Sequence, residues 1–397
     1  MSGLFGSAAT TSSTNAANTL GDLSKDIPLN NPPEDSISDL AFSPVSEHLA
    51  VASWDKKVRI YEILSSGQSE GRALFEFEGP VLSCHWSKDG KKVVGAGADK
   101  TARVMDLESN QTVSQVAAHD QPIKAARFFT APQTNGEMLV TGSWDNTIKY
   151  WDLRTPNPVI SVNMNHKVYT LDVQKNVLVV GTAERYINIV DLNMPDKIKK
   201  TIQSPLKWQT RGRCAIQYVE DKDASMNFSF KCHRDPPSNN MTNVYSVNAI
   251  SFHPIHGTFS TAGSDGTFHF WDGIAKHRLK GYPTVGGTIS ATAFNHTGGI
   301  FAYAVSYDWS KGYASNTPQY PNKVMLHPVN ADECKPRPSI EHLQDQPQYR
   351  QGRGESETPV MYARRKNIRE ELRTVIKRSI PKSGHIGSND IKCLKPT

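Results

Sequence analysis

Four aspartates and one histidine stand at positions where side-chain chemistry is conceivable. Asp55, Asp99, Asp145 and Asp265 each lie in a short polar turn between two apolar stretches, and His119 lies 26 residues before Asp145. A carboxylate that orients a histidine ring is one half of an acid–base catalytic arrangement. A turn acid can equally accept hydrogen bonds from its own turn backbone and from an upstream histidine. Because the acid recurs in nearly every copy of the same pattern, we interpret these five residues as structural.

Other chemistry-bearing motifs point away from an enzyme or a metal protein. The five cysteines are widely spaced and form no CxxC pair, which argues against a disulfide framework or a structural zinc site. The chain contains no GxxxxGK[ST] phosphate loop, no HExxH and no GxSxG. We therefore expect no catalytic residue, no metal and no cofactor, and we expect the cysteines to be buried or idle thiols in a reducing compartment.

The elements that position the turn acids form a repeat. The phrase LVTGSWDNTIKYWD at residues 139–152 recurs in related form at residues 49–61, 93–106, 177–191 and 258–272. The first three turn acids are 44 and 46 residues apart, and the fourth follows after 120 residues, or three steps of about 40. A period of 40–45 residues with four strands per unit is the signature of WD repeats. The sequence thus predicts an all-β propeller whose small sheets stack around an axis.

Counting predicts seven blades, of which the fifth is incomplete. The seventh has the variant turn SYDW at residues 306–309 and a returning strand near residues 323–326, and residues 26–29 are the candidate outer strand that closes the ring. Only 20 residues lie between Asp191 and Gly212, whereas three strands with their turns need about 30. We expect residues 214–219 to be the final strand of a blade that lacks about half its length. An alternative transcript would explain the shortage.

Composition divides the chain into three regions. Residues 1–25 are rich in Ser, Thr, Ala, Asn and Gly and are expected to be a disordered leader. Residues 26–338 are expected to form the propeller. Residues 339–397 are expected to be a polar tail with a basic helix near 364–378. The segment from Lys335 onward carries 14 Lys or Arg and 7 Asp or Glu, so the net charge of +6 belongs to the tail. The tail helix is either a nuclear-import or nucleic-acid patch or a solvated face. No stretch is apolar over about 18 residues, so no transmembrane helix is expected.

Several short sequence motifs identify a protein family more specifically than the repeat does. SPLK at residues 204–207, FKCHR at 230–234, VNAISFHP at 247–254 and SYDWSKG at 306–312 stand in this order, and GLFG occurs at residues 3–6. Together they resemble the nuclear-pore-associated WD-repeat mRNA export factor family, over about residues 27–338. A sister family consists of WD-repeat adaptors of the spindle checkpoint.

The resemblance implies a function and a set of binding residues. It implies a seven-bladed propeller in the nucleus and at the nuclear pore, shuttling to the cytoplasm, that binds a short acidic motif of a nucleoporin and supports export of mRNA as ribonucleoprotein. Arg234 of FKCHR would meet the acidic residues through its planar fork. Lys231 and His233 are further candidates for partner binding, and Lys311 is a candidate for contact with a partner or RNA phosphate.

Alternatives remain open at this point. A checkpoint-type adaptor would bind kinase motifs, but the SYDWSKG and GLFG motifs favour an mRNA export factor. Direct RNA binding by the near-neutral propeller would be modest and salt-dependent, with the tail as main contributor. We expect no membrane and no small-molecule substrate. The short fifth blade and the basic tail both depart from the family pattern, so they put ring closure and the position of the Arg234 loop in question.

Overall fold

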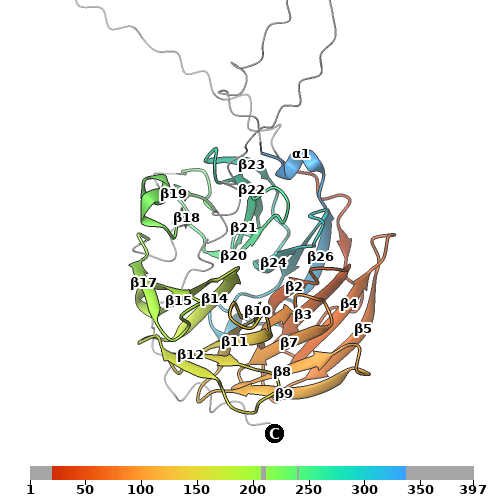
Figure 1. Ribbon diagram of the computed structural model, residues 1–397. Coiled ribbons are helices and arrows are strands. Elements are labelled where there is room, and N and C mark those ends of the chain that lie inside the picture. Colours follow the sequence, from red (N-terminus) through yellow and green to blue (C-terminus); the bar gives the residue numbers. More distant parts are fainter. Residues whose placement is uncertain (1–19, 207–211, 239–240, 337–397) are drawn as a thin grey trace, which may run out of the picture.

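Antiparallel sheets stand side by side around a central axis in the computed structural model, which describes residues 20–206, 212–238 and 241–336 (Figure 1). Six of the sheets in the described residues have four strands each, and one has two. The predicted all-β WD-repeat propeller is therefore confirmed. The predicted number of seven blades is wrong, because the structure has six complete blades. We number the positions one to seven in chain order, so that the two-stranded sheet occupies position five.

The first four blades follow one another along the chain, each with its first strand nearest the axis. Their strands are β2 Ile37–Phe42, β3 His48–Ser53, β4 Lys57–Ile63 and β5 Ser69–Glu76; β6 Val81–Trp86, β7 Lys92–Gly97, β8 Thr101–Asp106 and β9 Thr112–Ala118; β10 Ile123–Thr130, β11 Glu137–Ser143, β12 Thr147–Trp151 and β13 Ile160–Asn163; β14 Val168–Gln174, β15 Val177–Thr182, β16 Tyr186–Asp191 and β17 Ile198–Gln203.

The remaining sheets complete the ring. They consist of β18 Arg213–Ile216 and β19 Phe228–Lys231; β20 Val247–Phe252, β21 Phe259–Gly263, β22 Phe268–Asp272 and β23 His277–Gly281; and β24 Ile289–Phe294, β25 Ile300–Val305, β26 Lys323–Pro328 and β1 Ile27–Pro28. The described helices are short: the 3-10 turns Ala183–Arg185, Asp221–Met226 and Tyr313–Ser315, and the four-residue α1 Ala331–Cys334. No helix of the described residues is long and apolar enough to cross a membrane.

A tight turn between the second and third strands sets the register of each blade. The residue after the turn acid has a positive φ of 69° at Lys100, 72° at Asn146 and 70° at Gly266, a backbone region that glycine and asparagine adopt most readily. This reversal points the next N–H back at the acid, which accepts it from the residue two positions on. The four acids therefore hold their own turns, and the turns fix which faces of the strands are buried.

The N-terminal strand closes the ring. β1 pairs antiparallel with β26 as the outermost strand of blade seven, with Ile27 opposite Leu326, and this confirms the closing strand predicted at residues 26–29. Asp26, just before β1, accepts hydrogen bonds from the Tyr303 hydroxyl at 2.6 Å and from the His327 ring at 2.6 Å. Glu333 of α1 lies 3.5 Å from the other nitrogen of the same ring. We call Asp26, His327 and Glu333 the closing triad.

The ordered part of the chain begins before residue 26, the start that its composition suggests. The Gly21 N–H donates to the Gly281 carbonyl at 2.7 Å, Leu20 forms a bridge to the same residue, and Leu23 packs against the core between blades six and seven. The expected disordered leader up to residue 25 is thus corrected for residues 20–25. A few apolar side chains within a polar segment suffice when a finished blade offers them a surface. GLFG at residues 3–6, the tail and its candidate helix at 364–378 lie outside the described residues.

Position five holds only the outer half of a blade. β19 runs directly into His233 as β9 runs into His119, so β19 is a fourth strand and β18 a third strand. The expectation that residues 214–219 form the final strand is corrected accordingly. Buried apolar clusters join every other pair of neighbouring positions in the described chain, but none joins blade four to the two-stranded sheet. The segment before Gly212 is too short to supply the two inner strands.

Candidate functional site

A complete chain of hydrogen bonds surrounds His119. Its Nδ1 lies 2.8 Å from Asp145 and its Nε2 lies 2.7 Å from the Thr141 hydroxyl, which also accepts the indole N–H of Trp151 at 2.8 Å. Burial lowers the pKa of His119 against the opposing effect of Asp145, which favours a neutral ring. Each nitrogen already has a partner, so the ring carries no free group for catalysis and ties the turn to the blade.

His233 stands in a second copy of the same network. Its Nδ1 lies 2.9 Å from Asp265, its Nε2 lies 2.9 Å from the Thr261 hydroxyl, and Trp271 donates to that hydroxyl at 2.9 Å. The side chain is fully buried. Its partner-binding role, expected from the sequence, is therefore corrected, because an internal network occupies both nitrogens. The threonine ten residues before the tryptophan, present in both copies, is the signal that could have identified the second network.

The first two turn acids are held by arginine in place of histidine. Asp55 pairs with Arg59 and Asp99 with Arg103, each four residues on along the third strand. Asp55 also accepts the N–H of Glu34, and Asp99 that of Glu78, which ties each turn to the preceding loop.

One group of side chains has the geometry of a metal site. Ligand atoms of His233, Asp265 and His269 lie within 4.8 Å of one another. Burial lowers the pKa of His269 to about 3, helped by the neighbouring His233 and Arg278, so its ring is neutral. Both nitrogens of His233 are already bonded inside the blade, and a metal would have to displace Asp265 or Thr261. Of the three groups, His233 and Asp265 are held in the blade's own network, while the Nδ1 of His269 is buried without a hydrogen-bond partner among the described residues.

Arg234 lies where the link from position five to blade six begins. It is partly buried, its Nε donates to the Gly212 carbonyl at 3.2 Å, and its backbone pairs with Val244. The link folds back on itself, and the Tyr245 hydroxyl donates to Asp235 at 2.8 Å. The arginine is thus held by structured backbone on both sides. Lys231 is exposed at the end of β19.

Lys311 lies at the same end of the ring, in the loop after β25. This loop is tied to the blade-six turn because Asp308 accepts hydrogen bonds from the Ser264 hydroxyl at 2.7 Å and the Asn248 amide at 3.0 Å. Trp309 stacks on Trp54 of blade one with 3.9 Å between ring centroids. Lys311 is exposed beside this pair of rings. The structure therefore places all three residues on one end of the ring, Lys231 and Arg234 at position five and Lys311 over blade seven.

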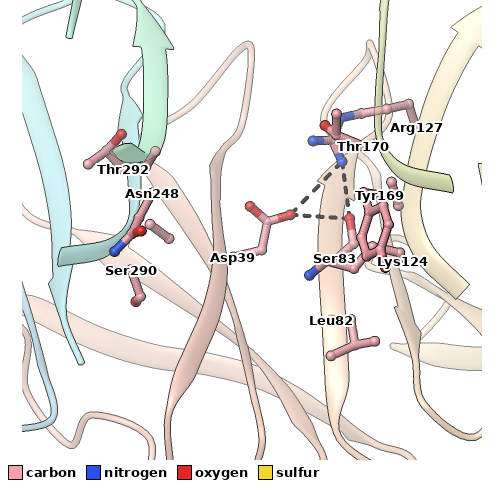
Figure 2. A pocket seen from close by; sticks show the side chains of 13 residues that line it. Asp39, Leu82, Ser83, Lys124, Arg127, Tyr169, Thr170, Asn248, Ser290 and Thr292 are labelled. Atoms are coloured by element: carbon pink, nitrogen blue, oxygen red, sulfur yellow. Dashed lines mark hydrogen bonds and ion pairs between the residues drawn. The ribbon is translucent and has the colours of Figure 1, made fainter. Parts of the chain in front are cut away.

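The inner strands enclose a polar cavity on the axis. Figure 2 shows Arg127 pointing across it toward Asp39 and Ser83, with its guanidinium 3.1 Å from the Ser83 hydroxyl and 3.9 Å from Asp39. Arg127 also lies 3.4 Å from Asp172. No histidine or cysteine is among the 13 residues that line the cavity. The charged groups link inner strands of different blades, and the Ser83 hydroxyl donates to Asp39 at 3.1 Å.

The described cysteines are free and buried: Cys84, Cys214, Cys232 and Cys334. Burial raises the pKa of each thiol, which reaches about 12 at Cys214. Protonated, buried thiols are poor nucleophiles and poor metal ligands.

Comparisons with known proteins agree with the repeat. The family model of the WD domain, G-beta repeat, matches residues 29–62, 71–106, 110–152 and 229–272. The last two matches each contain one complete histidine network, which shows that His233 and Asp265 belong to a single repeat.

Curated relatives extend over nearly the whole propeller. The chain is 62% identical over 361 residues to the mRNA export factor GLE2 of Chaetomium thermophilum, with 86% of this chain and 99% of that protein covered. It is 55% identical over 352 residues to the Poly(A)+ RNA export protein of Schizosaccharomyces pombe, covering 84% and 98%. It is 43% identical over 363 residues to the mRNA export factor of Danio rerio, covering 84% and 95%.

Proposed function

Since the chain belongs to the WD-repeat mRNA export factor family, with a role in mRNA export, we propose that it is a non-enzymatic adaptor at the nuclear pore that binds an acidic motif of a nucleoporin. Through this contact it supports the passage of ribonucleoprotein from nucleus to cytoplasm. The names of the relatives describe export and imply nucleocytoplasmic transport; the pore location, the nucleoporin and the adaptor role are our proposal.

The position of Arg234 is the observation that carries the proposal. The hydrogen bond from its Nε to Gly212 and the pairing of its backbone with Val244 fix the position of its side chain. It lies at the end of the ring that carries the turns between second and third strands. A guanidinium has five N–H donors in a planar fork, which matches a carboxylate through two parallel hydrogen bonds. An anchored arginine loses less side-chain freedom on binding than a mobile surface arginine does. Lys231 adds a second exposed cation three residues away.

The non-enzymatic part of the proposal rests on the repeat and on the cavity. WD repeats and the names of the relatives point to a non-catalytic scaffold. The histidines of both networks have partners for each nitrogen, and the arginine of the axial cavity pairs with carboxylates.

Calorimetric titration with a peptide of the acidic nucleoporin motif tests the proposal. We expect binding by the full chain and a loss of at least about thirtyfold in affinity for Arg234→Glu, because a desolvated charge pair would become a like-charge contact. Arg154→Glu is the matched control, since Arg154 is 87% exposed, follows a third strand and so lies at the opposite end of the ring. Absence of binding by wild-type protein with the circular dichroism of a folded β protein would refute the adaptor proposal.

A further inference from the structure

Among the residues that the structure describes, no strand lies beside the inner edge of β18. In the antiparallel pair of β18 and β19, the Cys232 N–H donates to the Gly212 carbonyl, so alternate residues of β18 hydrogen-bond to β19. Arg213 and Ala215 fall between them, and their N–H and C=O groups point away from β19. Within the described residues, the acceptor near the Ala215 N–H is the sulfur of neighbouring Cys214, which is a weak one. We call the backbone of Arg213 and Ala215 the open edge.

The face of blade four that points toward position five is also incompletely covered. The residue three positions before the end of each second strand faces the next blade, and it is 0% exposed at Ala50, Val94 and Val140. The corresponding residue of blade four, Val179, is partly exposed. An inner strand at position five would cover it. The described residues thus supply neither a backbone partner for the inner edge of β18 nor an apolar cover for Val179 of β15.

Two cationic side chains at the open edge would be stabilised by an acidic neighbour. Arg213 and Lys231 lie directly opposite each other across the two-stranded sheet, and both side chains are exposed. Like charges at opposed positions of a sheet are destabilising. No ion pair of either side chain with a carboxylate occurs among the described residues, and Arg213 has only the Ser229 hydroxyl, at 3.4 Å. A carboxylate placed beside Arg213 on the same face of the sheet would offset the repulsion.

We propose that an extended acidic segment of a partner protein adds to the open edge as a strand, pairing its backbone with Arg213 and Ala215. On the face turned toward blade four its carboxylates would lie beside Arg213, with Lys231 on the next strand, and its alternate side chains would point toward blade six. This inference rests on the proposed function, because it gives the acidic motif a second point of attachment beside Arg234. The chain's own tail is the poorer occupant, since its excess of Lys and Arg would be repelled by the same two cations.

Two proline variants test the pairing by removing one N–H each. Ala215→Pro removes the N–H that faces the vacant position, and proline is tolerated where an edge strand donates to nothing. Ser229→Pro is the matched control, because Ser229 lies opposite Ala215 and its N–H faces the outer edge of β19. The probe is a synthetic hairpin of alternating Glu and Val with an Asn-Gly turn, and the same hairpin with Lys for Glu is its control.

We expect the Glu hairpin to bind the wild-type chain, to bind Ala215→Pro about tenfold more weakly, and to bind Ser229→Pro as it binds wild type. Amide hydrogen exchange of the wild-type complex provides a readout without substitution, and exchange at Ala215 should slow. Equal affinity for both proline variants with unchanged exchange at Ala215 would overturn the inference. If the nucleoporin peptide still binds in an Arg234-dependent way in that case, the proposed function stands and only the strand addition fails.

Discussion

Raising the pH should open the closing triad before it unfolds any blade. The His327 side chain is 3% exposed and lies between the carboxylates of Asp26, 2.6 Å away, and Glu333, 3.5 Å away. Burial disfavours the charged ring, but the hydrogen bonds and charges of the two acids outweigh it and raise the pKa of His327 to about 9. The ring is therefore charged at neutral pH, and it joins the N-terminal strand to the helix after the last strand.

The magnitude follows from the difference between folded and unfolded pKa. A histidine with a pKa near 6.5 in the unfolded chain and about 9 in the fold binds its proton more tightly when folded. This stabilises the fold by about 3 kcal/mol at pH 6, below both values, and by only about 0.4 kcal/mol at pH 9. The contribution is lost as the pH rises from about 6.5 through 9. Glu333 behaves oppositely, because its lowered pKa gives stability that disappears as the pH falls into the acid range.

Urea unfolding at pH 6, 7.5, 9 and 10 measures this contribution. His327→Gln keeps a polar side chain without the titrating proton, so the gap in unfolding free energy between it and wild type should shrink by about 3 kcal/mol from pH 6 to pH 10. His296→Gln is the control, since His296 lies 3.6 Å from Glu47 at the surface with 29% of its side chain exposed. A gap that is the same at pH 6 and pH 10 would show that His327 acts by packing alone, and would refute the charged triad.

Two further pairs of substitutions test the turns and the missing strands. Lys100→Gly should raise the unfolding free energy by roughly 0.5–1 kcal/mol in urea, because it relieves a side chain held at φ 69°. Gly266→Ala should lower it by about 1–3 kcal/mol, since the new Cβ would stand 2.5 Å from the Gly287 carbonyl; an unchanged midpoint would contradict the assigned turn. Val140→Asp should lower the free energy of unfolding by more than about 3 kcal/mol and Val179→Asp by less than about 1.5 kcal/mol, because only the Val140 side chain is fully buried. Equal losses would show that position five is filled.

The repeat made much of the fold accessible from the sequence. The turn acids, the apolar strands on either side and the closing strand are local patterns, and each depends on residues within one blade or on the outermost strand. The shortage at position five was also visible, because the number of residues between Asp191 and Gly212 limits the strands that fit. The hydrogen bond expected between His119 and Asp145 is present, since both residues sit at fixed points of one repeat.

The remaining features depend on contacts that spacing does not reveal. His233 lies 32 residues before Asp265, whereas His119 lies 26 before Asp145, because the link after Arg234 folds back on itself. The longer spacing concealed the second network and made His233 look like a surface residue. The order of residues 20–25 depends on a surface of blade six that is distant in sequence. Which end of the ring displays Arg234 and Lys311 became clear only from the bond between Ser264 and Asp308.

Closing the ring with its own first strand imposes a delay during synthesis. Asp26 and His327 are 301 residues apart, so the N-terminal strand leaves the ribosome long before its partner exists. At about 5–20 residues per second, the wait lasts roughly 15–60 s. Throughout that time β1 has no partner strand, because β26 has not yet been synthesised. Residues 20–29 are therefore the part of the described chain that stays without its native neighbours for longest, and blade seven is complete only when synthesis has passed β26.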